Sequence, residues 1–235
     1  MGDLPAAGYG RVVAWSGGGA FVGSLLYCIG CYTWRFGDPD AGSGRIVVPV
    51  CVDLALFVAF AGHHSLFARP RWRARIRGVG PADLERPLYV WVASLLFVAV
   101  CAAWEPVAGV AWRAAGLGRV LLGAGQVAGA ALTVLAARRL DVLALAGIRP
   151  TPRPEPASLD THGPYGFVRH PIYVGWLLLV WCVPVMTGTR LAFAVISTAY
   201  LVVAVPLEER DLARTFPEYG AYRRRVRWRM LPGVY

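Results

Sequence analysis

Charged residues are scarce in this chain, and lysine is missing from it altogether. Only 16% of the 235 residues are charged, and all 24 basic residues are arginines. Hydrophobic residues make up 57% of the chain and gather in long runs. Such runs reach the length of about 20 residues that a helix needs to cross a bilayer, whereas soluble domains interrupt their apolar stretches. The scarcity of charge therefore excludes a soluble globular class and predicts an integral membrane protein.

The apolar runs also lack the period-two alternation of a membrane β-barrel. Their Leu, Val, Ala and Gly content suits helices, so the sequence predicts an all-α polytopic bundle. The first apolar segment is too long for a signal peptide and has no small-x-small cleavage site, so we expect none. Six membrane spans are predicted, roughly at residues 12–34, 46–67, 88–104, 118–137, 171–187 and 191–207.

Cysteine is too sparse for a disulfide framework, with five residues in apolar positions. Cys28 and Cys31 have the spacing of a redox or metal pair, but no second pair accompanies them. We interpret them as small residues on a packed helix face. Adjacent histidines at 63 and 64 point to different faces of a helix and cannot both bind one ion, so no metal site is predicted.

The arginines are distributed unevenly between the loops. With six spans, nineteen of them fall on the side of both termini and five on the other. The positive-inside rule then places the termini in the cytoplasm, in a cell membrane. This topology explains the net charge of +10 better than nucleic-acid binding does, and we reject that partner. Arg210–Arg229 is expected to form a basic amphipathic helix, weakened by Pro217, and residues 149–156 an extended proline-rich segment.

The most distinctive stretch is Gly163–Gly175, with Arg169 and His170 directly before Pro171. Proline favours the first position of a helix, so we expect free backbone N–H groups there that could bind an anionic group. Gly188-Thr189 is expected to turn the chain, so that the last two spans form a tight hairpin. That hairpin would bring Glu208 and Glu209 beside Arg169 and His170, although two carboxylates can also simply mark a membrane exit.

Two further patterns have a structural and a functional interpretation. Residues 123–128 fit a loose dinucleotide fingerprint but lie inside an apolar span, and Gly125 and Gly129 form a GxxxG pair, so helix packing is favoured. His63 and His64 stand at the end of the second span, where a structural polar contact is favoured over catalysis.

The order of motifs in residues 158–232 resembles the isoprenylcysteine carboxyl methyltransferase and phospholipid methyltransferase superfamily. The matching motifs are Arg169-His170-Pro171-x-Tyr173-x-Gly175, an apolar hairpin, Glu208-Glu209, Phe216-Pro-Glu-Tyr219-x-x-Tyr222 and Leu231-Pro232. One difference is Phe216-Pro217-Glu218, where the superfamily usually has Phe-Gly. The N-terminal half is similar to the methanethiol S-methyltransferases and their denitrification-associated relatives. The residues that carry this resemblance are His64 to Pro70, Glu85-Arg86-x-x-Tyr89-Val90, Asp141-x-x-x-Leu145 and Leu207 to Leu212.

The resemblance implies one membrane domain over residues 1–235 that uses S-adenosylmethionine. Residues 1–157 would shape the acceptor site and residues 158–235 would bind the cofactor. The implied cofactor-binding residues are Tyr165, Arg169, His170, Pro171, Tyr173, Gly175, Glu208, Glu209 and Tyr222. A thiol acceptor must lose its proton, and the candidate groups for this step are His64, Asp141, Arg69 and His170.

The implied reaction is methylation of a small thiol, methanethiol to dimethyl sulfide, in a bacterial inner membrane. Four alternatives remain open at this point. They are methylation of a prenylcysteine carboxylate, methylation of a phospholipid amine, NADPH-dependent reduction, and a non-enzymatic role in nitrogen-oxide metabolism. Membrane lipids are expected partners. The sequence does not indicate an oligomeric state.

Overall fold

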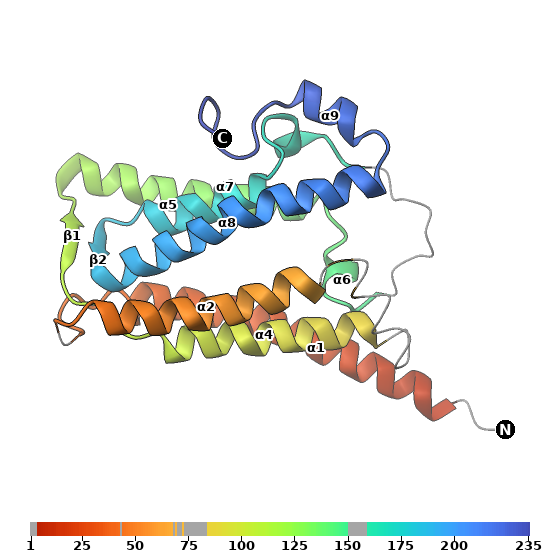
Figure 1. Cartoon of the computed structure of the whole chain (residues 1–235), viewed down its shortest axis with the longest axis horizontal. Coiled ribbons are helices and arrows are strands. Elements are labelled where there is room, and N and C mark those ends of the chain that lie inside the picture. The colour runs from red at the N-terminus through yellow and green to blue at the C-terminus, as the bar shows by residue number, and fades with distance from the viewer. Residues whose placement is uncertain (1–3, 43, 68, 70–71, 73–83, 150–158) are drawn as a thin grey trace. The chain divides into compact units, whose positions relative to one another are not determined.

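The computed structural model describes residues 4–42, 44–67, 69, 72, 84–149 and 159–235, which are mostly helical (Figure 1). Within these residues, five helical segments are long and apolar enough to cross a membrane: Tyr9–Arg35, Val47–Phe67, Glu85–Ala103, Gly116–Ala137 and Gly188–Thr215. The first comprises α1 (Leu4–Gly30) and the π-helical turn η1 (Cys31–Arg35), and the others are α2, α4, α5 and α8. The predicted polytopic helical membrane protein is therefore confirmed.

The predicted span at 171–187 is shorter than expected. Its helix, α7 (Pro171–Trp181), has 11 residues, about 17 Å at 1.5 Å per residue. Pro184 disfavours a helical conformation at the residue before it and cannot continue a helix itself. The chain instead forms β2 (Val185–Thr187), antiparallel to β1 (Val110–Arg113), with Val110 opposite Thr187. The turn between the last two apolar helices therefore lies before Gly188, where α8 already begins.

The chain divides into two compact units. The first contains α1, η1, α2, α4 and the short helix α6 (Val142–Leu145). The second contains β1, α5, the 3-10 turn η2 (Gly163–Gly166), α7, β2, α8 and α9 (Tyr219–Arg225). Helix α5 thus joins the C-terminal elements, whereas the sequence grouped it with the N-terminal spans. The reason is its close packing against α7.

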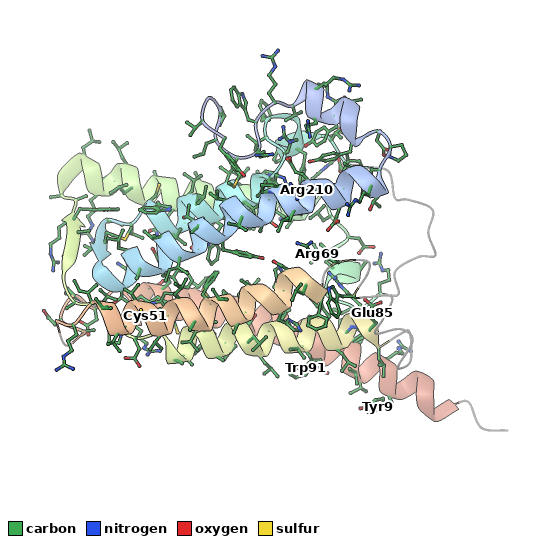
Figure 2. The ribbon with its side chains drawn as sticks, viewed as in Figure 1. Tyr9, Cys51, Arg69, Glu85, Trp91 and Arg210 are labelled. Carbon is green, nitrogen blue, oxygen red and sulfur yellow. The ribbon has the colours of Figure 1, made fainter. Side chains whose placement is uncertain are left out.

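In the first unit, α1 packs on α4 through glycine. The indole of Trp91 lies where a Cβ on Gly17 would come within 3.0 Å of it, and its Nε1 donates to the Val13 carbonyl at 3.2 Å (Figure 2). At the other end of α4, the Arg35 guanidinium donates to the carbonyls of Cys101, Ala102 and Trp104. These carbonyls have no helical partner, so Arg35 caps the helix. Cys28 and Cys31 are buried and form no disulfide. This agrees with their interpretation as small residues on a packed helix face.

In the second unit, α5 and α7 approach each other at two glycines. A Cβ on Gly129 would lie 2.8 Å from the Gly175 carbonyl oxygen, and a Cβ on Gly175 would collide with Thr133 Oγ1. Gly125 faces Cys182, with 2.8 Å from its ideal Cβ position to Sγ. Only glycine allows this backbone separation. The GxxxG pair in α5 is therefore a packing motif, and the interpretation of residues 123–128 as helix packing is confirmed.

Helix α8 returns beside α7, so the expected C-terminal hairpin is present (Figure 1). Trp176 Nε1 donates to Ser197 Oγ at 3.2 Å, and Trp181 Nε1 donates to Thr198 Oγ1 at 2.9 Å. The side chain of Thr187 accepts from the Arg190 N–H and caps the start of α8. A buried apolar cluster of Leu177, Leu201, Val205 and Met230 joins the two helices to the C-terminal segment.

The predicted helix over Arg210–Arg229 is interrupted. Helix α8 continues to Thr215, Phe216-Pro217 separates it from α9, and the chain is non-helical again after Arg225. Pro217 breaks the helical hydrogen-bond ladder, and the backbone of residues 226–229 bonds elsewhere, as described below. Residues 150–156 of the expected proline-rich segment and most of the basic loop at 69–86 lie outside the described residues.

Candidate active site

The start of α7 is held by the C-terminal segment. The backbone N–H of Arg169 donates to the Trp228 carbonyl at 2.9 Å, and that of His170 donates to the Arg229 carbonyl at 2.8 Å. Pro171 has no N–H to offer. The backbone N–H groups of Arg169 and His170 are therefore not available to an anion, because two carbonyls of the C-terminal segment already accept from them.

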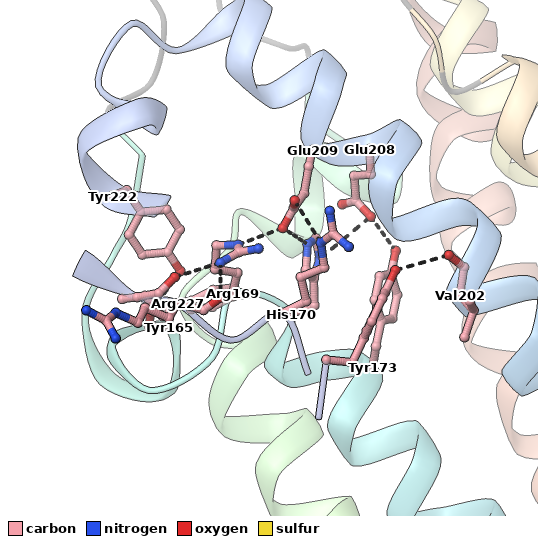
Figure 3. A network of polar contacts seen from close by, with 12 residues as sticks. Tyr165, Arg169, His170, Tyr173, Val202, Glu208, Glu209, Tyr222 and Arg227 are labelled. Carbon is pink, nitrogen blue, oxygen red and sulfur yellow. Dashed lines mark hydrogen bonds and ion pairs between the residues drawn. The ribbon is translucent and has the colours of Figure 1, made fainter. Parts of the chain in front are cut away.

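The Arg169 side chain also joins the start of α7 to the C-terminal segment. Its Nε donates to Glu209 Oε1 at 2.6 Å, and its Nη1 donates to the carbonyls of Val226 and Arg227 at 2.7 and 2.6 Å (Figure 3). Arg169 is 93% buried, with a relative exposure of 7%. A buried guanidinium requires such acceptors, because its N–H groups are removed from water. Arg169 therefore links α7, α8 and the C-terminal segment.

Glu209 lies between three basic side chains. Arg169 and His170 contact its Oε1, with His170 Nε2 at 3.3 Å, and Arg229 Nε donates to its Oε2 at 3.1 Å. The Glu209 side chain is only 4% exposed. Both carboxylate oxygens contact basic side chains, so Glu209 links these side chains inside the network. The expected juxtaposition of Glu209 with Arg169 and His170 is confirmed.

Glu208 faces outward from the same network. Its Oε2 accepts a hydrogen bond from the Tyr173 hydroxyl at 2.7 Å, and the side chain remains 43% exposed (Figure 3). The Tyr173 ring stacks on the His170 imidazole, with ring centroids 5.4 Å apart and an interplanar angle of 6°. An accessible carboxylate beside two stacked rings can accept hydroxyl or ammonium hydrogens and attract a cation over the ring faces.

Tyr165 and Tyr222 lie on the other side of Arg169. The Tyr222 hydroxyl donates to the Tyr165 carbonyl at 2.8 Å. Burial raises the pKa of each phenol to about 12, so both stay neutral. Tyr222 packs with Tyr219 and Val226 in a buried cluster. Of the other expected cofactor residues, Pro171 is buried at the first position of α7, and Gly175 lies in the contact with α5.

Of the candidate groups for thiol deprotonation, His64, Asp141 and Arg69 lie in the first unit and His170 in the second. His64, near the end of α2, has its Nδ1 2.9 Å from the Tyr89 hydroxyl, which also lies 3.3 Å from the His64 carbonyl oxygen. Phe60 stacks on the His64 ring and His63 stacks on Tyr89. The Arg86 guanidinium covers the Tyr89 ring at 5.0 Å. The histidine and tyrosine thus form a polar pair enclosed by aromatic rings.

Asp141 and Arg69 have local structural partners. The Asp141 carboxylate accepts from the Ala144 N–H at 3.0 Å and caps α6, and it also pairs with Arg149 at 3.3 Å. Arg69 Nε donates to the Ser65 carbonyl at 3.2 Å, one turn back in α2. Neither contact tests a catalytic role. Within the described residues, no group of three or more His, Cys, Asp or Glu side chains could hold a metal ion.

Sequence reasoning missed three participants. Arg229 is the third side chain in contact with the Glu209 carboxylate, and Tyr235 lies against the Arg229 guanidinium at 5.0 Å. Tyr89 belongs to a motif that carries the family resemblance, but the sequence did not indicate that it contacts His64. The signal for Arg229 was hidden among the many arginines of the tail, because no local pattern distinguishes an arginine that turns inward from its exposed neighbours.

A protein-family model and several known proteins match this chain. The phospholipid methyltransferase family model matches residues 119–218. The chain is 34% identical to methanethiol S-methyltransferase 2 of Bradyrhizobium diazoefficiens, over 88% of this chain and 84% of that protein. It is 32% identical to the methanethiol S-methyltransferase of Crocosphaera subtropica, over 77% of this chain and 74% of the relative.

A relative with a different kind of name shows a similar level of identity. Human nurim is 30% identical over 89% of this chain and 88% of that protein. No solved structure matches the chain.

Proposed function

Because this chain belongs to the methanethiol S-methyltransferase family, and is therefore a methyltransferase, we propose that it methylates methanethiol with S-adenosylmethionine as methyl donor. The product would be dimethyl sulfide. The identity and coverage of the relatives support this acceptor, and the polar network of the second unit supports the donor.

The observation that carries the proposal is that Glu208 and Glu209 differ in their partners and in their exposure. Glu209 is saturated by Arg169, His170 and Arg229, whereas Glu208 keeps an accessible carboxylate beside Tyr173. These groups fit the chemistry of S-adenosylmethionine, which carries ribose hydroxyls, an ammonium group and a sulfonium centre. Glu208 would accept from the hydroxyls or the ammonium, and the rings of His170 and Tyr173 would face its cationic or adenine part.

In this proposal, the remaining expected cofactor residues have structural roles. Arg169 and Glu209 hold the framework, and Tyr165 and Tyr222 brace the segment behind Arg169. The cofactor would supply a methyl group on a positively charged sulfur, which transfers in line to a nucleophile. The chain's own task is to orient the reactants and exclude water.

Deprotonation of the acceptor thiol is assigned to His64. The Tyr89 hydroxyl has one hydrogen and two contacts on His64, the carbonyl oxygen and Nδ1. When Tyr89 donates to the carbonyl, its oxygen accepts from Nδ1–H, and Nε2 then carries the free lone pair. The thiol proton would pass to Nε2 and leave a thiolate, the nucleophilic form. Arg69 is a weaker candidate because a guanidinium has no lone pair to accept a proton, and Asp141 because its exposed carboxylate pairs with Arg149.

Calorimetry and headspace gas chromatography test the proposal together. Purified protein should bind S-adenosylmethionine and S-adenosylhomocysteine but not NADPH, and should release dimethyl sulfide from methanethiol. Glu208→Ala should weaken S-adenosylmethionine binding about ten-fold, the loss expected for hydrogen bonds to a charged group. Asp211→Ala is the matched control, since Asp211 lies one turn further along α8 and, among the described residues, its carboxylate pairs only with the exposed Arg214.

Two results would contradict the proposal. Dimethyl sulfide no higher than in a control without enzyme would exclude methanethiol as acceptor, and an unchanged dissociation constant for Glu208→Ala would exclude its cofactor role. Methyl transfer to a phospholipid amine or a prenylcysteine analogue would identify a lipid acceptor instead. We also place the network on the cytoplasmic side of a bacterial inner membrane, where the arginine distribution supports access to a soluble cofactor.

A further inference from the structure

The last six residues fold back on themselves. We call residues 230–235 the C-terminal hook. The backbone N–H groups of Met230 and Leu231 each donate to the Tyr235 carbonyl at 3.0 Å, and the Tyr235 N–H donates to the Leu231 carbonyl at 2.9 Å. The Met230 side chain is buried in the cluster between α7 and α8. The hook therefore has a defined conformation, and both Met230 and Tyr235 pack in this apolar cluster.

A proline in α8 creates a site for this hook. Pro206 lies inside the helix and has no N–H, so the carbonyl four residues earlier, that of Val202, lacks its usual helical donor. The Tyr235 hydroxyl donates to this carbonyl at 3.2 Å, and Figure 3 shows the bond at Val202. A side chain distant in sequence thus replaces the hydrogen bond that proline removes.

The ring of Tyr235 makes a second contact that leads into the site. The Arg229 guanidinium lies 5.0 Å from the ring centroid, within the range of a cation–π interaction. Arg229 Nε donates to Glu209 Oε2, and the Arg229 carbonyl accepts from the His170 N–H. Tyr235 therefore lies one contact away from the groups that orient Glu209 and His170.

We propose that Tyr235 is a positioning residue for the cofactor site. Its hydroxyl fastens the hook to the carbonyl exposed by Pro206, and its ring holds Arg229 against Glu209. The fastening of the hook is inferred from the contacts of Tyr235 alone, whereas its effect on cofactor binding rests on the proposed function. Tyr235 has no direct part in methyl transfer in this proposal.

Removal of one hydroxyl tests the fastening. Tyr235→Phe keeps the ring and loses one hydrogen bond, which is worth about five-fold in an equilibrium constant. The dissociation constant of S-adenosylmethionine should rise by about that factor, while the KM for methanethiol stays unchanged. Amide hydrogen exchange of Met230, Leu231 and Tyr235 should accelerate. Tyr9→Phe is the matched control because Tyr9 is exposed near the start of α1.

A double-mutant cycle tests the role of Pro206. Pro206→Ala restores the helical N–H, so the Val202 carbonyl keeps a partner when the Tyr235 hydroxyl is removed. Tyr235→Phe should therefore change hook exchange and cofactor binding less in the Pro206→Ala background than in the natural chain. Pro49→Ala is the control, since Pro49 lies in the first turn of α2, where proline removes no intrahelical bond.

The outcomes separate this inference from the proposed function. Failure of the natural chain to bind S-adenosylmethionine would reject the proposed donor. Amide hydrogen exchange in the hook would still test whether the Tyr235 hydroxyl fastens it. Unchanged exchange in Tyr235→Phe would overturn the fastening. Normal cofactor binding in Tyr235→Phe, with Glu208→Ala impaired, would overturn the contribution of the hydroxyl fastening to the cofactor site. Equal effects of Tyr235→Phe in both backgrounds would overturn the role of Pro206.

Discussion

The polar groups of the two units are satisfied in different ways. In the second unit, Glu209 is enclosed by Arg169, His170 and Arg229, so that a buried charge has charged partners on both oxygens. In the first unit, His64 and Tyr89 form one hydrogen-bonded pair among stacked rings. Among the described residues, no hydrogen bond involves His64 Nε2. A saturated carboxylate supports structure, whereas an imidazole with a free nitrogen can move a proton.

This difference predicts opposite responses to mutation. Loss of a group from the second network should reduce stability, because the remaining buried charges would lack partners. Loss of the imidazole from the first pair should reduce turnover and leave the fold largely intact, because no buried charge is left uncompensated.

The largest expected effect is that of Glu209→Ala. The substitution leaves the buried Arg169 guanidinium with a missing partner, and breaking a buried ion pair costs about 3–5 kcal/mol. Unfolding in detergent micelles would measure the loss. The neighbouring Glu208→Ala should change the free energy of unfolding by less than about 0.5 kcal/mol, because Glu208 is at the surface. Equal destabilisation by both variants would contradict the assignment of a structural role to Glu209 alone.

His64→Ala should reduce methanethiol turnover about 100-fold, since a general base contributes at least this much. The dissociation constant of S-adenosylmethionine should remain within two-fold of the natural value, roughly the error of a binding measurement in detergent. Stopped assays at saturating cofactor, together with calorimetry, provide the two values. His63→Phe serves as the control because it preserves stacking on Tyr89. A turnover number unchanged by His64→Ala would remove His64 from the reaction.

Gly175→Ala should destabilise the second unit by about 1–3 kcal/mol, the cost of overpacking. The new methyl group would collide with Thr133 and approach the Gly129 carbonyl. Gly123→Ala, in α5, is the matched control: no atom lies within 4 Å of its ideal Cβ, and alanine favours a helix over glycine. Thermal unfolding of both variants distinguishes helix packing from a cofactor role for Gly175. A stable Gly175→Ala variant with impaired cofactor binding would favour the latter.

The smallest effect concerns Asp160. The His162 N–H and then the Arg139 guanidinium lower the pKa of this carboxyl below its ordinary value of 3.8. The folded state therefore binds fewer protons than the unfolded state, so the contribution to stability is present above pH 3.8 and is lost as pH falls through the lower folded pKa. Asp160→Asn should flatten this part of the stability profile. A profile with the same slope in both proteins would show that Asp160 does not contribute.

Several features could be predicted from local sequence. The apolar runs identified the five long helices of the described residues, because crossing a bilayer fixes both length and composition. The end of the last one was placed at residue 207, whereas α8 continues to Thr215. The adjacency of Glu208–Glu209 and Arg169–His170 followed from a hairpin between consecutive helices. The length of α7 was overestimated, since apolar composition continues past Trp181 and does not distinguish a helix from the strand that pairs with β1.

The sequence by itself determined that the chain enters a membrane as helices and that a polar motif stands at the start of α7. Only the tertiary structure decided which groups of that motif remain accessible. Glu208 and Glu209 are adjacent and chemically identical, yet one is 43% exposed and the other 4%. The cause is distant in sequence, because Arg229 and the carbonyls of residues 226–229 close around Arg169 and Glu209. Such closure depends on the path of the chain end, which no local pattern encodes.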